Sequence, residues 1–319
     1  MSALPATFQE ARWGSTPIRN LNLAIEGTDL EDVLKEFERE RERLELKMRS
    51  HYYLSTEWGV PFGTVSIAIP FYLAQRELRE LHAEKVGDVE GASQADILRY
   101  LRHELGHVVN YAYKLYERED WLTQFGSITQ PYRDDYRPEP FSPRFVRHLP
   151  GWYAQKHPDE DWAETFAVWM TPGLDWKTEY QAWPMALAKL NYCDRIMGVL
   201  KGKEPIVTIT ELDEDVAELS YSVEDFYQQQ ALGEERLPPG LDGAVRAIFD
   251  DLHPAGDKTL ERTPASTLIR KLLRTLPRQV YRPEQEAAVI VAITTLVTSL
   301  AMNYVYLGSY LPRETTPTK

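Results

Sequence analysis

The feature that most constrains this chain is a pair of histidines four residues apart, His103 and His107, in a strongly periodic stretch. Apolar residues recur there every three or four positions, which predicts a helix with one buried stripe. The stripe consists of Leu98, Leu101, Leu105, Val108, Ala112 and Leu115. Ser93, with Asp96 three residues later, is the expected N-cap. Because residues i and i+4 share a helix face, both imidazoles should lie together, away from the stripe and toward a cleft.

A glutamate follows the first histidine, so the motif reads His103-Glu104-Leu105-Gly106-His107. Two imidazoles on one helix face can bind one zinc ion, and the glutamate can reach a zinc-bound water as general base. The alternative is a surface helix with two solvated histidines. That alternative leaves a downstream pair of acids unexplained.

Glu160 and Glu164 are candidates for the third zinc ligand. Pro158 suits the first turn of a helix, in which the two glutamates lie one turn apart on one face. The aromatic residues of this helix share another side, expected to face the core: Trp162, Phe166 and Trp169. One acid can complete a His2Glu site for Zn2+, and the other can accept a hydrogen bond from a ligand imidazole.

These motifs resemble those of the gluzincin peptidases and, among them, a family of zinc-binding metallopeptidases found mainly in bacteria. Four stretches carry the resemblance: His51–Trp58, Ile67–Ala74, Arg102–His107 and His157–Thr165. It covers roughly residues 19–171. It implies a hydrolase that cleaves peptide bonds of a peptide or protein substrate through a zinc-activated water, with Glu104 as general base.

Lethal-factor-type peptidases have a similar glutamate helix. In them the first acid of an E-x-x-A-E run binds zinc, and a tyrosine seven residues earlier assists catalysis. The resemblance implies Glu160 as the ligand and Tyr153 as a catalytic residue; a tyrosine merely packed in its loop is the alternative. The spacing also favours Glu160, because Glu164 four residues later can orient a ligand imidazole, whereas Val168, four residues after Glu164, cannot. We therefore expect His103, His107 and Glu160 to bind zinc, with Glu164 behind a ligand.

The overall composition, 43% hydrophobic and 27% charged residues, is that of a soluble globular protein. The formal net charge of −13 argues against a nucleic-acid partner, which requires a basic surface. We expect no signal peptide and a cytoplasmic location, because no basic segment followed by an apolar run opens the chain. Cys193 is the single cysteine, which excludes an intramolecular disulfide and a cysteine zinc site. Many family members carry an N-terminal cysteine-rich zinc ribbon, and we expect no role tied to that ribbon here.

The resemblance and the periodicity together predict an α+β, zincin-like metallopeptidase domain, with a small mixed sheet and active-site helices. Strands are expected at residues 18–26, 51–54 and 64–69, and helices at residues 29–48 and 71–85. In zincins the strand before the active helix is an open edge that pairs with substrate, so the resemblance implies this role for residues 64–69. A buried core strand is the alternative. Residues 120–151 predict a long loop that forms a wall of the cleft.

Lys201–Pro205 is a candidate boundary between a catalytic domain at residues 1–200 and a mainly helical C-terminal region at residues 201–319. The uncharged run Ala287–Leu311 is long enough to span a bilayer and follows several basic residues. Its polar residues fit a buried helix, which we favour over a membrane anchor. Two alternatives to a cytoplasmic zinc peptidase therefore remain: a zinc-stabilised, non-catalytic protein-binding module, and a tail-anchored membrane peptidase.

Overall fold

The computed structural model describes residues 13–86, 89–132, 139, 142–233, 249–250 and 311–312. Residues 1–236 form one compact unit, and residues 237–319 form a second. The described part of the second unit is an antiparallel pair of short strands, β3 (Phe249–Asp250) and β4 (Leu311–Pro312). The helices predicted after residue 243 and the uncharged run at residues 287–311 lie outside the described residues. Within the described ranges, no helix is both long and apolar enough to cross a membrane.

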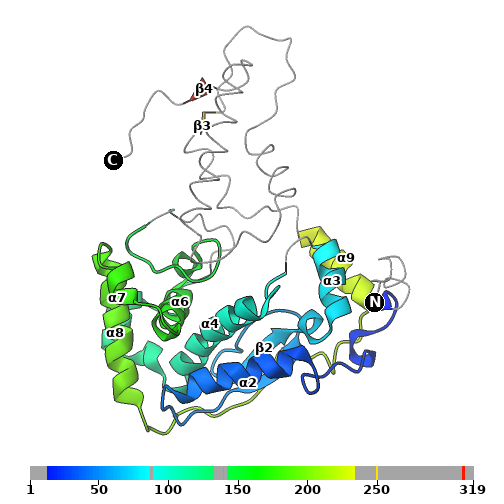
Figure 1. The fold of residues 1–319 in the computed structure, drawn as a ribbon, viewed down its shortest axis with the longest axis horizontal. Coiled ribbons are helices and arrows are strands. Elements are labelled where there is room, and N and C mark those ends of the chain that lie inside the picture. The colour runs from blue at the N-terminus through cyan, green and yellow to red at the C-terminus, as the bar shows by residue number, and fades with distance from the viewer. Residues whose placement is uncertain are drawn as a thin grey trace. The chain divides into compact units, whose positions relative to one another are not determined.

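The first unit is mainly helical and contains a two-stranded sheet (Figure 1), which confirms the predicted α+β class. Its elements are η1 (Ile18–Asn20), α2 (Asp29–Glu42), β1 (His51–Ser55), β2 (Ser66–Pro70), η2 (Phe71–Ala74), α3 (Arg76–Lys85), α4 (Gln94–Ala112), η3 (Leu115–Glu117), α5 (Glu119–Phe125), η4 (Tyr153–Gln155), α6 (Pro158–Met170), α7 (Trp176–Glu179), α8 (Pro184–Leu200) and α9 (Val223–Gly233).

The sheet pairs β1 with β2 in parallel, with Tyr53 opposite Ala68. Every residue of β2 is buried. The edge of β2 away from β1 is also engaged, because the loop between the strands folds back and the amide of Ala68 donates a 2.8 Å hydrogen bond to the carbonyl of Gly59. Gly63 supports this reversal with a φ of 76°. The prediction of an open substrate edge is therefore wrong at Ala68, and β2 is the buried core strand of the alternative.

The strand expected at residues 18–26 is absent from the structure. Ile18 starts a short 3-10 helix instead, and the backbone of Asn22 is left-handed, with a φ of 52°. The alternating apolar residues of this stretch still pack against the core, although not from a strand: Leu21, Leu23 and Ile25. The alternation of apolar residues therefore correctly indicated which side chains pack against the core, but the strand that it predicted is wrong.

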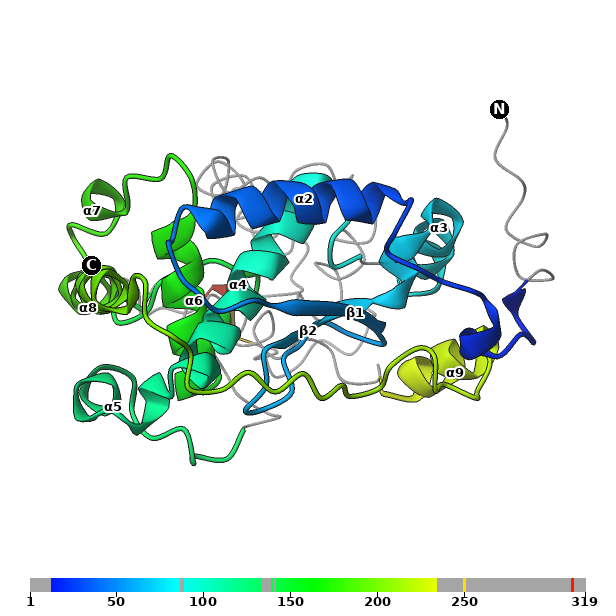
Figure 2. The same ribbon diagram turned by 90° about the horizontal axis from the view of Figure 1, so that it is seen from below.

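Helix α4 lies between α2 and α6 in both ribbon views (Figures 1 and 2). Ser93 caps its N-terminus by accepting a 3.2 Å hydrogen bond from the amide of Asp96, as predicted. The predicted stripe is buried in the core. Helices α4 and α6 are in close contact at Gly106, whose carbonyl accepts a 2.8 Å hydrogen bond from the indole of Trp162. This contact brings the histidine and glutamate motifs together.

Replacing Gly106 with alanine is expected to destabilise the protein. A Cβ there would lie 2.8 Å from the backbone Cα of Ala163, which cannot move without shifting α6. Overpacking of about 2–3 kcal/mol, less the roughly 1 kcal/mol that alanine gains in a helix, leaves a net loss of about 1–2 kcal/mol. The midpoint temperature of thermal unfolding measures this loss, since each kcal/mol lowers it by about 2–4 °C for a unit of this size. Gly198→Ala in α8 is the matched control, because nothing lies within 4 Å of its Cβ position; equal stability of both variants would contradict the close approach.

Residues 201–222 run as an extended segment from α8 to α9 (Figure 2). The amide of Val207 donates to the carbonyl of Ala112 at 3.0 Å, and the carbonyl of Ile209 accepts from Val65 at 2.8 Å. These hydrogen bonds fasten the segment to α4 and to the start of β2. The division predicted after residue 200 stays a prediction, because most of the predicted C-terminal region lies outside the described residues.

Candidate metal centre

Three side chains from the two motifs converge in the interior: His103 and His107 from α4, and Glu160 from α6. The two Nε2 atoms lie 3.2 Å apart. Oε2 of Glu160 lies 3.0 Å from Nε2 of His103 and 3.4 Å from Nε2 of His107. Ligands of a tetrahedral zinc ion, with bonds of about 2.0–2.1 Å, lie about 3.3–3.4 Å apart. The three donor atoms therefore have the spacing of one face of such a tetrahedron.

The Nδ1 atom of each histidine, on the outer side of the cluster, is hydrogen-bonded to a carboxylate. Nδ1 of His103 donates to Oε1 of Glu164, and Nδ1 of His107 donates to Oδ2 of Asp159, each at 2.9 Å. A neutral imidazole that donates from Nδ1 carries its lone pair on Nε2. Two nitrogen lone pairs and a carboxylate oxygen thus face one point. Such a cluster of electron pairs requires a positive charge at its centre.

The electrostatics of the cluster agree with this requirement. Burial lowers the pKa of His103, but its hydrogen bonds to Glu160 and Glu164 outweigh burial and raise that pKa to about 9. Burial also lowers the pKa of His107, but the charges of Asp159 and Glu160 raise it well above its usual range. Burial raises the pKa of Glu160, but the nearby histidines hold it well below its ordinary value. The site therefore stabilises positive charge strongly.

Glu164 is held rigidly behind His103. Its side chain is 0% exposed. Besides the imidazole, it accepts backbone hydrogen bonds from His148 at 2.9 Å and from Leu149 at 3.0 and 3.1 Å. The end of the long loop thereby fixes the carboxylate that orients one imidazole. This position matches the one that the sequence predicts for Glu164.

Asp159 is the carboxylate behind His107, and sequence reasoning missed it. Its Oδ1 accepts a 2.7 Å hydrogen bond from the side-chain amide of Asn110, and its Oδ2 also accepts a hydrogen bond from the hydroxyl of Tyr111. The sequence carried a signal for it, since a metal site with two imidazoles needs two acceptors and Glu164 can serve only one of them. His157 caps α6, because its Nδ1 accepts a hydrogen bond from the backbone amide of Asp159 at 3.2 Å.

Glu104 lies on α4 beside the cluster and is 4% exposed. No hydrogen bond within the described part of the chain engages its carboxylate. Burial raises its pKa, while the charges of His103 and His107 lower it, and the net value is about 7. A carboxylate with this pKa and without a fixed partner can both accept and release a proton near neutral pH.

A family model described as "Putative zinc-binding metallo-peptidase" matches residues 66–239, more than half of the 319-residue chain. The chain belongs to this family. The match runs from β2 past α9, so it contains both motifs, but it starts after the His51–Trp58 stretch and extends beyond Thr171. The family description names zinc, and the buried cluster of two histidines and a glutamate can hold such an ion. Comparisons with curated proteins and with solved structures find no match.

Two tyrosines line the cluster. The ring of Tyr153 packs edge-on against the ring of His103, with centroids 5.7 Å apart, and its hydroxyl accepts a 3.3 Å hydrogen bond from Lys156. The sequence placed Tyr153 near the site, and the structure brings it there. Tyr132, which sequence reasoning did not single out, donates a 2.9 Å hydrogen bond to Oε1 of Glu160. Its position 28 residues before its partner left no local signal.

Other polar residues near the motifs have structural contacts. Nε2 of His148 donates a 2.9 Å hydrogen bond to the carbonyl of Arg99, and burial lowers the pKa of this imidazole to about 4. His148 is therefore a neutral loop residue. The guanidinium of Arg147 lies against the rings of Trp152 and Trp183, at 4.8 and 5.1 Å. Two further arginines of this loop, Arg133 and Arg137, lie outside the described residues.

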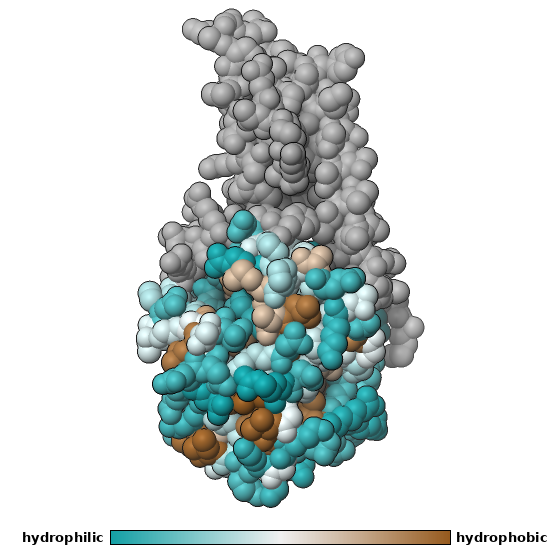
Figure 3. Space-filling model, turned by 90° about the vertical axis from the view of Figure 1, so that its left-hand side faces the viewer, coloured by the Kyte–Doolittle hydropathy of each residue, from teal (hydrophilic) through white to brown (hydrophobic). Residues whose placement is uncertain are grey.

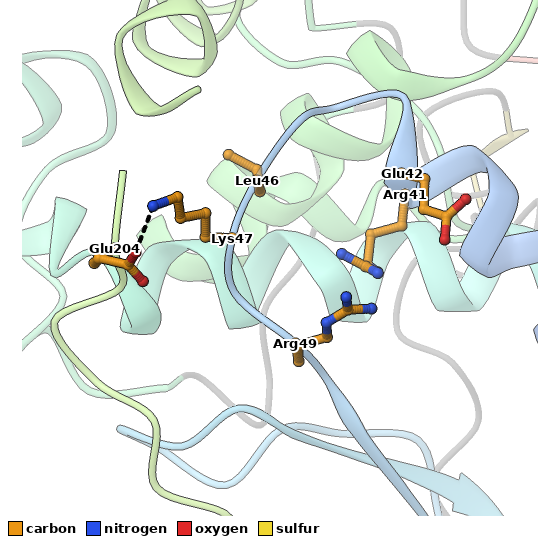
Figure 4. A pocket seen from close by; sticks show the side chains of 6 residues that line it. All are labelled: Arg41, Glu42, Leu46, Lys47, Arg49 and Glu204. Atoms are coloured by element: carbon orange, nitrogen blue, oxygen red, sulfur yellow. Dashed lines mark hydrogen bonds and ion pairs between the residues drawn. The ribbon is translucent and has the colours of Figure 1, made fainter. Parts of the chain in front are cut away.

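A polar hollow of about 380 Å³ lies at the end of α2 and beside the loop that follows it, and no residue of the cluster lines it (Figure 4). Its lining consists of Arg41, Glu42, Leu46, Lys47, Arg49 and Glu204. Arg41 donates to Glu38 and to a backbone carbonyl, and Lys47 pairs with Glu204 at 2.5 Å. These cations are already engaged in contacts within the chain, so we assign no chemistry to this hollow.

The described side chains on the face formed by α7 and α8 are mostly hydrophilic, with apolar ones in small, separate groups (Figure 3). Met185 and Val199 are exposed apolar residues of α8. Small groups of apolar side chains are ordinary on soluble proteins, whereas binding surfaces are marked by larger continuous patches. This face therefore gives no support to the alternative of a protein-binding module.

Proposed function

We propose that this chain is a zinc-dependent metallopeptidase in which His103, His107 and Glu160 bind the ion and Glu104 is the general base. One observation carries the proposal. Two imidazole lone pairs and a carboxylate oxygen converge at 3.0–3.4 Å in a buried site, and both imidazoles are fixed by carboxylates behind them. Hydrogen-bonded carboxylates are the usual partners of metal-binding histidines.

When bound, a zinc ion supplies Lewis acidity that polarises a scissile carbonyl and makes a water molecule more acidic. His103, His107 and Glu160 would hold the ion, and a site with three protein donors would leave room for substrate or water, as catalytic zinc sites do. Glu104 accepts the proton of the attacking water and delivers it to the leaving amine. Tyr153, beside His103, donates a hydrogen bond to the oxyanion that forms at the attacked carbonyl. The paired motifs on α4 and α6 support the gluzincin type of site and a zincin-like fold.

We expect about one tightly bound zinc per chain, because the donor set is complete and buried. Elemental analysis of the purified full-length protein measures this zinc content. His107→Ala should lose the ion, whereas His51→Ala, which removes an exposed imidazole on β1, should keep it. A wild-type protein without zinc, even after reconstitution, would exclude the proposal.

A further inference from the structure

Each of the three donor side chains has a second partner outside the cluster. His103 has Glu164, His107 has Asp159, and the remaining donor, Glu160, has Tyr132. The hydroxyl of Tyr132 donates a hydrogen bond to Oε1 of Glu160, while Oε2 faces both imidazoles. The two oxygens of this carboxylate therefore have different roles, and a hydroxyl outside the motifs distinguishes them.

Tyr132 is held in place by the beginning of α6. Its ring stacks on the ring of His157, with centroids 4.0 Å apart and planes 12° apart. His157 is itself fixed, because it caps α6 through the Asp159 amide and donates to the Gln130 carbonyl at 2.8 Å. The ammonium of Lys156 lies 5.6 Å from the Tyr132 ring centroid. The position of the hydroxyl is thus set by the same helix that carries Glu160.

Core packing does not account for this arrangement. Tyr132 is 48% exposed, yet its hydroxyl points to a carboxylate that is 5% exposed. Tyrosines with exposed rings ordinarily direct the hydroxyl to water. An inward hydrogen bond also satisfies Oε1, which would otherwise be a buried charged acceptor without a donor.

We propose that Tyr132 is a positioning residue that holds Glu160 as a one-oxygen ligand, leaving Oε2 for the ion and keeping Oε1 away from it. This inference rests on the proposed function. A carboxylate that binds through both oxygens would occupy a further coordination position, one that the reaction needs for water or substrate. The hydroxyl therefore preserves the open position and fixes the direction of the ligand oxygen.

The test is Tyr132→Phe, which keeps the stacked ring and removes the hydroxyl. Zinc affinity, measured by competition with a chelator, should fall by about 10–100-fold, as for other groups that orient metal ligands. Tyr52→Phe is the matched control, because the hydroxyl of Tyr52 also donates to a glutamate, Glu38, but one outside the cluster, so the zinc affinity of this variant should be unchanged. In cobalt-substituted protein, Tyr132→Phe should weaken the visible absorption, because four-coordinate cobalt absorbs more strongly than five-coordinate cobalt.

A double-mutant cycle separates positioning from general damage to the fold. In a Glu160→Gln background, Tyr132→Phe should cause little further loss of zinc affinity, because the carboxylate that it orients is gone. Equal affinity and an identical cobalt spectrum for Tyr132→Phe and wild type would overturn the inference while leaving the zinc site intact. An equal loss in both backgrounds would also overturn it. Failure of the wild type to bind zinc would instead overturn the proposed function.

Discussion

Replacing Glu104 with glutamine is expected to lower peptide hydrolysis by about two to four orders of magnitude, the usual share of a general base, while zinc remains bound. The substitution keeps size and shape but removes the proton acceptor. Zinc should stay because Glu104 is not among the three converging donors. The measurement is a cleavage profile of a peptide library with purified wild-type and variant proteins, with zinc content determined on the same samples.

Glu77→Gln is the matched control, since Glu77 is an exposed glutamate on α3, and this variant should cleave like the wild type. Equal cleavage by Glu104→Gln and wild type would remove Glu104 from the mechanism. Zinc bound by both proteins, with no cleavage by either, would instead favour the protein-binding module. The three results are distinct, so one experiment separates the catalytic residue from the activity itself.

The sequence predicted the parts of the site that depend on helix geometry. Once the apolar stripe predicts a helix, the four-residue spacing of His103 and His107 places both on one helix face. In the structure both lie on α4 with their imidazoles adjacent. The same holds for Glu160 and Glu164, one turn apart on α6. These relations are local, because they depend on helical periodicity and not on how the rest of the chain packs.

The parts that escaped prediction depend on tertiary contacts. Tyr132 reaches Glu160 across 28 residues, through a loop whose path no local pattern specifies. The carbonyl of Gly59 occupies the edge of β2 because the intervening loop folds back on it. Asp159 is an intermediate case, since its helix was predicted, but its contact with His107 depends on how α6 crosses α4 at Gly106. The structure adds the contacts that hold the side chains of the cluster in place.

Glu160→Gln is expected to weaken zinc binding more than Glu164→Gln does. Glu160 presents Oε2 directly to both Nε2 atoms. Glu164 contacts the histidine pair only at the outer nitrogen of His103. Loss of an orienting carboxylate costs about 10–100-fold in affinity, and loss of a ligand costs more. Chelator competition on the two variants and the wild type gives the order, and a larger loss for Glu164→Gln would reverse the assignment of the ligand.

A second readout distinguishes the two acids by a different physical effect. Both oxygens of Glu164 accept hydrogen bonds, from the His103 imidazole and from the amides of His148 and Leu149. A glutamine there must turn its NH2 group toward one of these donors, which leaves a buried donor unpaired at a cost of about 1–3 kcal/mol. Glu164→Gln should therefore lower the unfolding free energy of the metal-free protein, measured by denaturant titration. Glu160→Gln meets no such conflict at Oε1 if its carbonyl oxygen turns to Tyr132, so its main effect should fall on zinc affinity. A metal-free Glu164→Gln protein as stable as the wild type would contradict this account of how the loop end and α6 hold His103.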